Sequence, residues 1–178
     1  GTIWNAGPFA AKGAQLAWLE ADLAKANTAE ERKVRPWVIV GGHRPMYTSS
    51  KPGPDRLIWG NATEKLRLAM ESTFAKHGVD IYFSGHVHSY ERAFPVLDGV
   101  VAQRNYSSPK APVHVVIGSA GNIEGPTKHW LAPPAWLAYR NYKDFGYGML
   151  NVINASVLEW EYRRATDNSV ADSFTLTK

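Results

Sequence analysis

The sequence predicts an α/β domain that ends in an antiparallel β-meander. Residues 37–84 contain a short apolar run, an amphipathic helical pattern and a second short apolar run, which is typical of a strand–helix–strand unit. Residues 147–176 contain three β-like runs separated by turn-forming residues. The chain of 178 residues is 44% hydrophobic and 20% charged, so it has the composition of a globular domain with a buried core.

The first half of the chain begins with a helical pattern. Leu16, Leu19 and Leu23 recur at spacings of three and four, which predicts a helix over residues 15–26 with one buried stripe. The polar residues 27–35 are expected to form a loop. Residues 37–40 are apolar and end at a pair of glycines, so they predict a buried strand that places His43 just beyond its carboxyl end.

A second helix and a second strand follow a loop rich in Pro and Gly. Asn61 and Glu64 have the spacing of a capping box, and a helical apolar face continues to His77, where Gly78 is a natural stop. Residues 81–83 are the next strand. Because strand–helix–strand units cross over right-handed between parallel strands, the residues after both strands should meet at one edge of the sheet.

The second half is predicted to be mainly β-structure. Residues 113–117 form a strand, and residues 126–145 are a long loop rich in Pro and aromatic residues. Within the meander, Leu158, Trp160 and Tyr162 alternate with polar residues. No linker divides the sequence, so residues 1–178 are expected to be one domain. Gly1 is not an initiator methionine and no signal peptide opens the chain, so a processed or partial product is expected.

Composition narrows the function. The net charge of +4 is mild and forms no basic run, so no nucleic acid is expected as a partner, and no apolar run is long enough to span a membrane. The absence of cysteine excludes disulfides and thiolate metal sites. Asn-X-Ser/Thr sites at Asn61, Asn105 and Asn154 are glycosylation candidates and favour a secreted, extracellular protein or its vacuolar or periplasmic equivalent.

The stretch that follows the second strand carries the chemistry. If His86 and His88 continue the strand, their side chains leave on one side about 6 to 7 Å apart at the backbone. That spacing suits one imidazole on each of two metal ions about 3.5 to 4 Å apart. Gly85 is expected to permit a turn that a side chain would block. With His43, three imidazoles would gather at one sheet edge, where metal binding outweighs a purely structural role.

The remaining histidines have simpler interpretations. His114 lies within a strand and is expected to be a hydrogen-bonded core residue. His77 is expected to interact with the dipole at the end of its helix. His129 lies in the long loop and is assigned no metal.

Several sequence stretches together are similar to one protein family. The stretches GGHRPMY (41–47) and SGHVHSYERAFP (84–95), then HVVIGSAGN (114–122) and FGYG (145–148), resemble the purple acid phosphatases of the calcineurin-like metallophosphoesterase superfamily. The helical stretch QLAWLEADLAKA (15–26) is also similar. The resemblance implies the C-terminal half of a metallophosphoesterase β-sandwich flanked by helices, an α/β fold of the α+β sandwich type.

The resemblance also implies a reaction and a metal centre. His43 and His86 would bind a divalent ion (Zn, Fe or Mn), and His88 would bind Fe(III), in a dinuclear centre that hydrolyses phosphate monoesters at acidic pH. A metal-bound hydroxide would attack phosphorus in line. Tyr90, Glu91 and Arg92 would orient the site or bind substrate, with structural packing nearly equal in weight.

Two features of the family are missing from this sequence. The N-terminal motifs GDxG, GDxxY and GNH, which supply the bridging Asp, a second Asp, a Tyr and an Asn, do not occur. The other metal ligands are therefore expected from an N-terminal fragment of the same polypeptide. Residues 44–60 also lack the histidine pair that donates the leaving-group proton in plant members, so the general acid is unassigned and His129 is only a candidate. Loops 44–60 and 121–145 would shape the pocket, with Trp59, Trp130 and Trp136 mainly in packing roles.

Three other functions fit parts of the pattern. The same fold hydrolyses phosphodiesters or nucleotides in other members of the superfamily. A non-catalytic domain that binds carbohydrate or a partner protein would account for the 7 Trp, 8 Tyr and 6 Phe. A zinc hydrolase complete in this chain would use the three histidines on one ion. Stoichiometric metal separates the enzymes from the binding domain.

Overall fold

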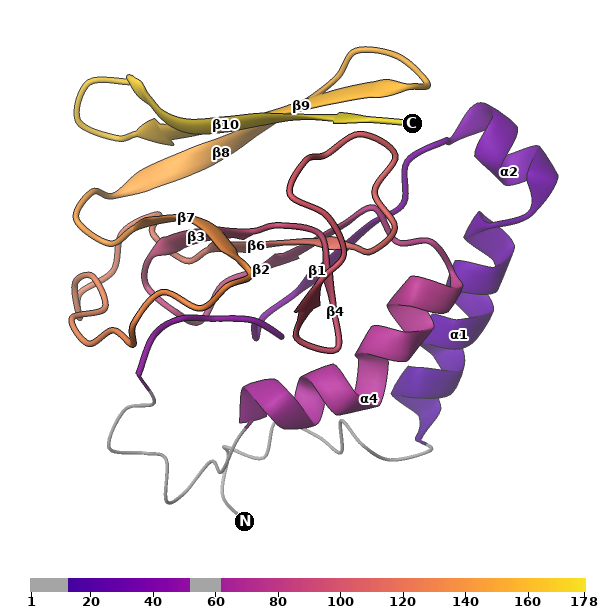
Figure 1. The fold of residues 1–178 in the computed structure, drawn as a ribbon, viewed down its shortest axis with the longest axis horizontal. Helices are drawn as coiled ribbons and strands as arrows, with labels where there is room; N and C mark the ends of the chain where they lie inside the picture. Colours follow the sequence, from indigo (N-terminus) through magenta and orange to yellow (C-terminus); the bar gives the residue numbers. More distant parts are fainter. Residues whose placement is uncertain (1–12, 52–61) are drawn as a thin grey trace.

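Helices, a five-stranded sheet and a three-stranded sheet form successive layers in the computed structural model, which describes residues 13–51 and 62–178 (Figure 1). The elements are α1 (Ala14–Ala26), α2 (Ala29–Val34), β1 (Ile39–Gly42), α4 (Ala62–Lys76), β2 (Ile81–Ser84), β3 (Tyr90–Ala93), β4 (Val96–Leu97), β5 (Val100–Val101), β6 (Val113–Ile117), β7 (Leu137–Asn141), β8 (Gly146–Val152), β9 (Val157–Arg164) and β10 (Val170–Thr177).

The five-stranded sheet has the order β1-β2-β6-β3-β7. Strands β1, β2 and β6 are parallel, whereas β3 runs antiparallel to both β6 and β7. Gly42 lies opposite Ser84 in the register, so β1 and β2 end level with each other. The predicted parallel strand–helix–strand unit is confirmed, and the chain leaves both strands at the same edge of the sheet.

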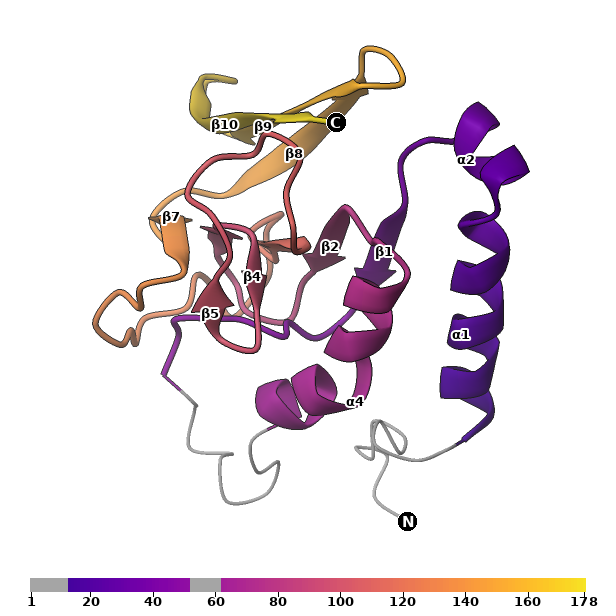
Figure 2. The ribbon, with the colours of Figure 1, turned by 45° about the vertical axis from the view of Figure 1, so that its right-hand side comes forward.

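Two hydrophobic cores lie on opposite faces of this sheet. Tyr82 faces α1 and α4 and joins a cluster with Leu23 and Phe74, whereas its neighbour Ile81 faces the meander and packs in a cluster with Leu158. Successive side chains of a strand point to opposite faces, so the short β2 contributes to both cores. Figure 2 shows α1 and α4 on one side of the sheet and β8, β9 and β10 on the other. The sandwich expected from the resemblance is present.

The C-terminal meander is confirmed as predicted. Strands β8, β9 and β10 form an antiparallel sheet in the order β10-β9-β8. The alternating residues Leu158, Trp160 and Tyr162 are 0%, 4% and 0% exposed and cover the five-stranded sheet. Period-two alternation on one strand is therefore what binds the two sheets together.

Two predicted loops contain regular structure. Residues 29–34, expected to be a loop, form α2, in which the Thr28 side chain accepts a hydrogen bond from the Glu31 backbone N–H. This short helix has no apolar stripe that would predict it from the sequence, and its N-terminal cap is its main local signal. The predicted loop 126–145 includes β7, which pairs with β3. Proline and aromatic residues around β7 hid its strand pattern.

One expected strand differs in its exposure, and one histidine has a partner that the sequence did not indicate. Strand β1, expected to be buried, is largely exposed: Ile39 is 38% exposed because β1 is the outermost strand of the sheet. His77 does not act through the helix dipole alone, because its Nε2 lies 3.0 Å from Glu20 Oε2 of α1 and its ring is buried.

Asn61, the proposed cap of α4, lies outside the described residues. None of the described helices is long and apolar enough to cross a membrane.

His114 is buried without the hydrogen bonds expected of it. The His114 side chain, which belongs to β6, is only 3% exposed, and neither of its ring nitrogens has a hydrogen-bond partner. The rings of Tyr47 and Tyr82 pack edge-on against the imidazole at centroid distances of 4.7 and 5.8 Å. Burial therefore disfavours the charged imidazole and lowers the pKa of His114 to about 3.

We expect the buried His114 to make the fold sensitive to acid. The pKa of His114 is about 3 when folded, against 6.5 for an unperturbed imidazole, so the unfolded chain binds a proton more readily below pH 6.5. The free energy of unfolding therefore keeps its full value above pH 6.5 and falls as the pH drops below it, by about 2 kcal/mol at pH 5. Thermal unfolding of His114→Leu and wild type at pH 7 and 5 checks this. Between pH 7 and pH 5, the midpoint of thermal unfolding should fall by about 4–8 °C more in wild type than in His114→Leu. Equal decreases in both proteins would contradict this role of His114.

Candidate metal centre

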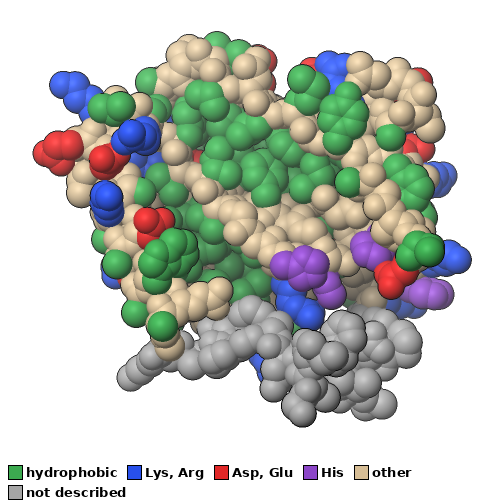
Figure 3. All heavy atoms as spheres, turned by 180° about the vertical axis from the view of Figure 1, so that it is seen from behind, with side chains coloured by type: hydrophobic (Ala, Val, Ile, Leu, Met, Phe, Trp, Pro, Cys, Tyr) green, Lys and Arg blue, Asp and Glu red, His purple; other side chains and the backbone are tan. Residues whose placement is uncertain are grey.

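The carboxyl ends of β1 and β2 bring two histidines together. His43 follows β1 directly, and His86 lies two residues beyond β2. His86 Nδ1 lies 3.2 Å from His43 Nε2, and the backbone N–H of Gly85 donates to the His43 carbonyl at 3.0 Å. Both side chains are exposed, and Figure 3 shows histidine side chains along one rim of the molecule. The predicted meeting of His43 and His86 is therefore found.

The separation of the two nitrogens fits ligands of one metal ion. Two imidazoles bound to a tetrahedral ion at 2.0–2.1 Å have their nitrogens about 3.4 Å apart. The nitrogens of His43 and His86, 3.2 Å apart, are close to this distance. Arg44 lies at the other side of the ring, with Nη1 3.2 Å from His86 Nε2. Metal binding through Nδ1 leaves the ring proton on Nε2, so Arg44 then has to turn away.

The backbone at His86 differs from the extended form that the sequence predicted. His86 adopts φ 64°, in the left-handed region that non-glycine residues seldom occupy. The Val87 and Ser89 N–H groups each donate to the carbonyl two residues earlier, so this segment is a series of tight turns. Gly85 has no positive φ, and a Cβ there would lie 3.8 Å from the His43 carbonyl oxygen, an ordinary contact. The unusual conformation therefore falls on His86 itself, as backbone strain often does at functional sites.

The surroundings of His86 keep its imidazole neutral. Desolvation by the atoms packed around the ring is the main cause that lowers the pKa of His86, to about 4, although part of the side chain is open to solvent, and the neighbouring Arg44, His43 and His88 act in the same direction. Glu124 opposes them. Metal ligation requires the neutral imidazole, so His86 stays a competent ligand in mildly acidic solution.

His88 makes a different set of contacts from the first two histidines. Its Nδ1 lies 3.5 Å from Glu124 Oε2. Its backbone makes two hydrogen bonds with Thr127: His88 N–H donates to Oγ1 at 3.1 Å, and Thr127 N–H donates to the His88 carbonyl at 3.0 Å. The loop over residues 124–127 therefore fixes the position of His88.

Within the described residues, no three His, Asp or Glu side chains are grouped closely enough to hold one ion. His43, His86 and His88 are all described and do not form such a group, so the geometry gives no support to a zinc hydrolase complete in this chain. The chain supplies a pair of imidazoles at one point and a third imidazole beside an acidic side chain.

A close backbone contact at Gly118 supports the histidine turn. A Cβ at Gly118 would lie 2.0 Å from the Val87 carbonyl oxygen, and the Gly118 N–H donates to the Ser89 carbonyl at 3.0 Å. Only glycine lets β6 approach the turn this closely. The close approach at Gly118 therefore fixes the position of the turn that carries His86 and His88.

We expect Gly118→Ala to displace this turn. The overpacked contact should cost about 1–3 kcal/mol of stability and reduce metal binding, as measured by denaturant unfolding and by metal content. Gly85→Ala is the matched control, since its Cβ meets only the ordinary 3.8 Å contact. Equal metal content in Gly118→Ala and wild type would contradict this account of the turn.

The residues after the histidines contact two different parts of the structure. The Tyr90 hydroxyl and the Arg92 guanidinium both donate to Asp172 of β10, so they link the two sheets. The Glu91 carboxylate lies on the opposite side of β3 and accepts hydrogen bonds from Thr48 and Ser49. Tyr90 and Arg92 thus have the packing role that the sequence left open, whereas Glu91 contacts the loop that follows His43.

The candidate pocket loops make mixed contacts. The Trp130 ring lies under the Arg140 guanidinium at 4.7 Å, and Trp136 packs against Tyr47 in the core. Trp59 lies outside the described residues.

Three residues that contact the histidines were not predicted as part of the site: Arg44, Glu124 and Thr127. Arg44 is part of GGHRPMY, but no periodic pattern marks the other two.

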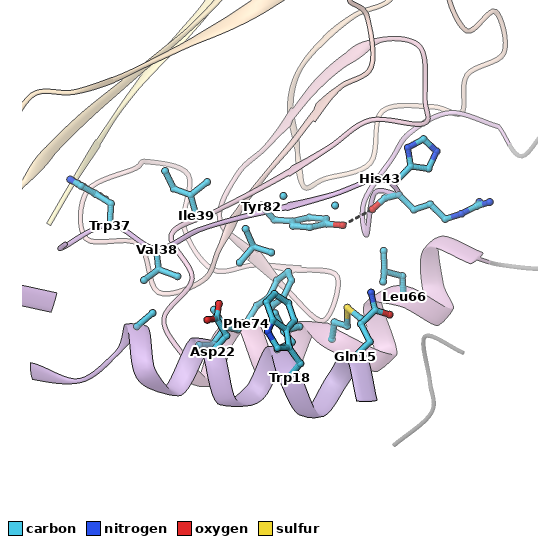
Figure 4. Close-up of a pocket in the computed structure, with 18 of the residues that line it drawn as sticks. Gln15, Trp18, Asp22, Trp37, Val38, Ile39, His43, Leu66, Phe74 and Tyr82 are labelled. Carbon is cyan, nitrogen blue, oxygen red and sulfur yellow. Dashed lines mark hydrogen bonds between the residues drawn. The ribbon is translucent and has the colours of Figure 1, made fainter. Parts of the chain in front are cut away.

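An apolar cavity runs along β1 towards the histidines. It has a volume of about 600 Å³ and lies between α1, β1 and α4 (Figure 4). Trp18, Phe74 and Tyr82 give it aromatic walls, and His43 lies at one end. The Tyr82 hydroxyl donates to the Arg44 carbonyl at 2.7 Å and so fixes the start of the loop after His43.

Comparison with known proteins identifies the family to which this chain belongs. A model of calcineurin-like phosphoesterases matches residues 6–90, and a model of the iron/zinc purple acid phosphatase-like C-terminal region matches residues 111–173. Acid phosphatase type 7 of Danio rerio is 38% identical over 92% of this chain, and purple acid phosphatase 22 of Arabidopsis thaliana is 35% identical over 90%. The chain belongs to the purple acid phosphatase family. A solved purple acid phosphatase from yellow lupin seeds superimposes on 96% of the chain, with a TM-score of 0.82 and 29% identity.

The chain covers only part of these family members. It spans 40% of the zebrafish protein, 33% of the Arabidopsis protein and 29% of the lupin chain. The purple acid phosphatase resemblance read from GGHRPMY and SGHVHSYERAFP is therefore confirmed for this part of the length.

Proposed function

We propose that the polypeptide containing this chain hydrolyses phosphate monoesters at acidic pH with a dinuclear metal centre. The pair of imidazole nitrogens 3.2 Å apart at the carboxyl edge of β1 and β2 carries this proposal. Open α/β sheets place their ligands at this edge. The family membership supplies the chemical class of the reaction.

The proposed centre divides the three histidines between two ions. His43 and His86 would hold a divalent ion (Zn, Fe or Mn), and His88 would hold Fe(III). When bound, such a pair of ions supplies a hydroxide nucleophile and neutralises the phosphate oxygens. The chain contributes imidazoles that are fixed by the turn at His86 and by the two hydrogen bonds between His88 and Thr127.

The remaining ligands are proposed to come from an N-terminal part of the same polypeptide. Strand β1 is the outermost strand of its sheet, and its outer edge pairs with no strand among residues 13–51 and 62–178. A strand added parallel to β1 would end beside His43, so the residues after it would reach the histidines. The apolar cavity along β1 would receive its side chains.

The surface around the histidines supports this partner. Figure 3 shows hydrophobic side chains gathered in the middle of the face whose lower rim carries histidines. Among the described residues of β1 and β8, several apolar side chains are exposed, with Ile39 38%, Met149 49% and Val152 53% exposed. Exposed apolar surface of this kind marks an interface with another part of a protein.

Secretion and glycosylation are proposed from the sequons. Asn105 and Asn154 are both exposed, and in each the side-chain Oδ1 accepts a backbone N–H two residues on. Their positions on turns leave room for a glycan. Asn61 lies outside the described residues.

Metal analysis of the complete polypeptide tests the proposal. We expect about one iron and one divalent ion per chain, together with hydrolysis of p-nitrophenyl phosphate at mildly acidic pH. Faster hydrolysis of bis(p-nitrophenyl) phosphate would favour the phosphodiesterase. A polypeptide without stoichiometric metal and without hydrolysis would favour the binding domain, whose His43→Ala variant would bind its ligand unchanged.

A further inference from the structure

Glu91 is a buried carboxylate whose hydrogen bonds all come from one loop. Its side chain is 2% exposed on β3. Oε1 accepts the Thr48 hydroxyl at 2.6 Å, and Oε2 accepts the Ser49 N–H at 2.7 Å and the Ser49 hydroxyl at 2.6 Å. Burying a carboxylate is costly unless it is hydrogen-bonded, so these contacts hold the loop firmly against β3.

The loop held by Glu91 pairs with the loop that precedes β7. Ser50 and Trp130 form an antiparallel bridge, and the Leu131 N–H donates to the Ser49 carbonyl at 2.9 Å. Arg140 of β7 donates to the Ser49 hydroxyl at 2.9 Å. Residues 48–51 therefore connect β3 to residues 129–131.

The second loop in turn holds His88. Thr127 lies two residues before this pairing and exchanges two hydrogen bonds with the His88 backbone. A continuous set of hydrogen bonds thus leads from Glu91 through residues 48–51 and 127–131 to His88. The first of these loops begins at His43, whose carbonyl accepts the Gly85 N–H.

We propose that Glu91 is a positioning residue that fixes His88 relative to His43 through the two paired loops. Its contacts run through 48–51 and 127–131, and it needs no contact with a metal ion to act. The consequence for metal binding rests on the proposed function, whereas the effect on the loops rests on the contacts alone. Residues that orient metal ligands from outside typically change metal affinity by about 10- to 100-fold.

Hydrogen exchange of the complete polypeptide tests the loop contacts. Glu91→Gln keeps the shape of the side chain but removes the charge. We expect exchange in peptides covering 47–51 and 126–132 to accelerate by at least about tenfold, because hydrogen bonds to a charged group are lost. Acceleration of 47–51 alone would overturn the proposal.

Asp172→Asn is the matched control. Asp172 is also buried and also accepts side-chain hydrogen bonds from β3, from Tyr90 and Arg92, but these lie between the two sheets. Its variant should leave exchange in 47–51 and 126–132 unchanged. Equal acceleration in both variants would mean a general loss of stability and would overturn the role of Glu91.

Cobalt titration of the metal-free polypeptide separates this inference from the proposed function. We expect Co²⁺ to bind Glu91→Gln at least about tenfold more weakly than wild type, with Asp172→Asn unchanged. Unchanged Co²⁺ affinity in Glu91→Gln would overturn the positioning of His88. If wild type binds no Co²⁺, the proposed function fails, and the exchange result alone decides whether Glu91 holds the loops.

Discussion

His86→Ala is expected to lower the phosphomonoesterase activity of the complete polypeptide by at least about a thousandfold. Loss of one of two imidazoles that share a metal ion should empty that position, and a metal ion supplies several kcal/mol of transition-state stabilisation. The comparison is kcat/KM for p-nitrophenyl phosphate, with metal content measured on the same preparations. The variant should lose the divalent ion.

The control for this substitution is His77→Ala. His77 pairs with Glu20 at the far end of α4 and should affect stability without changing metal content. Circular dichroism of both variants shows whether the fold is retained. A His86→Ala protein that keeps both metal ions and stays within tenfold of wild-type activity would remove His86 from the metal centre.

Arg92→Met is expected to cost about 3–5 kcal/mol of stability. The Arg92 guanidinium makes two 2.7 Å hydrogen bonds to Asp172, and the two side chains are only 10% and 7% exposed. Removing the cation leaves a buried carboxylate with Tyr90 as its remaining donor in this cluster. The midpoint of thermal unfolding should fall by roughly 6–20 °C.

Two further variants isolate the cause. Arg92→Met with Asp172→Leu removes both charges and should recover much of the lost stability, because no unpaired charge stays buried. Arg164→Met breaks a partly exposed pair with Asp144 and should cost far less stability than Arg92→Met, because solvent screens that pair. If the double variant is no more stable than Arg92→Met, the loss does not come from the unpaired carboxylate.

Local patterns in the sequence were sufficient for most of the fold. The apolar spacing of Leu16, Leu19 and Leu23 located α1, and the alternation through Trp160 located β9. These signals are local, because one buried face repeats with the period of the element. Helix α2 has no such face, and only the Thr28 cap with Glu31 marked it. Strand β7 is defined by its pairing with β3, which no local pattern records.

The site was predictable where topology decided it. Parallel strands that end level brought His43 and His86 together as expected. The left-handed turn at His86 was not predicted, since a non-glycine residue gives no sequence signal for positive φ. The partners of His88 were missed because Glu124 and Thr127 reach it from a loop far along the chain.

The outer edge of β1 has a consequence for how this polypeptide folds. Natural sheets protect an edge with lysine, proline or a bulge, but β1 consists of Ile39, Val40 and two glycines and carries no such device. An uncovered edge of this kind is a template for aggregation with other chains. The sequence of β1 is therefore that of an interior strand, and the N-terminal part proposed to pair with it would also protect it against self-association during synthesis.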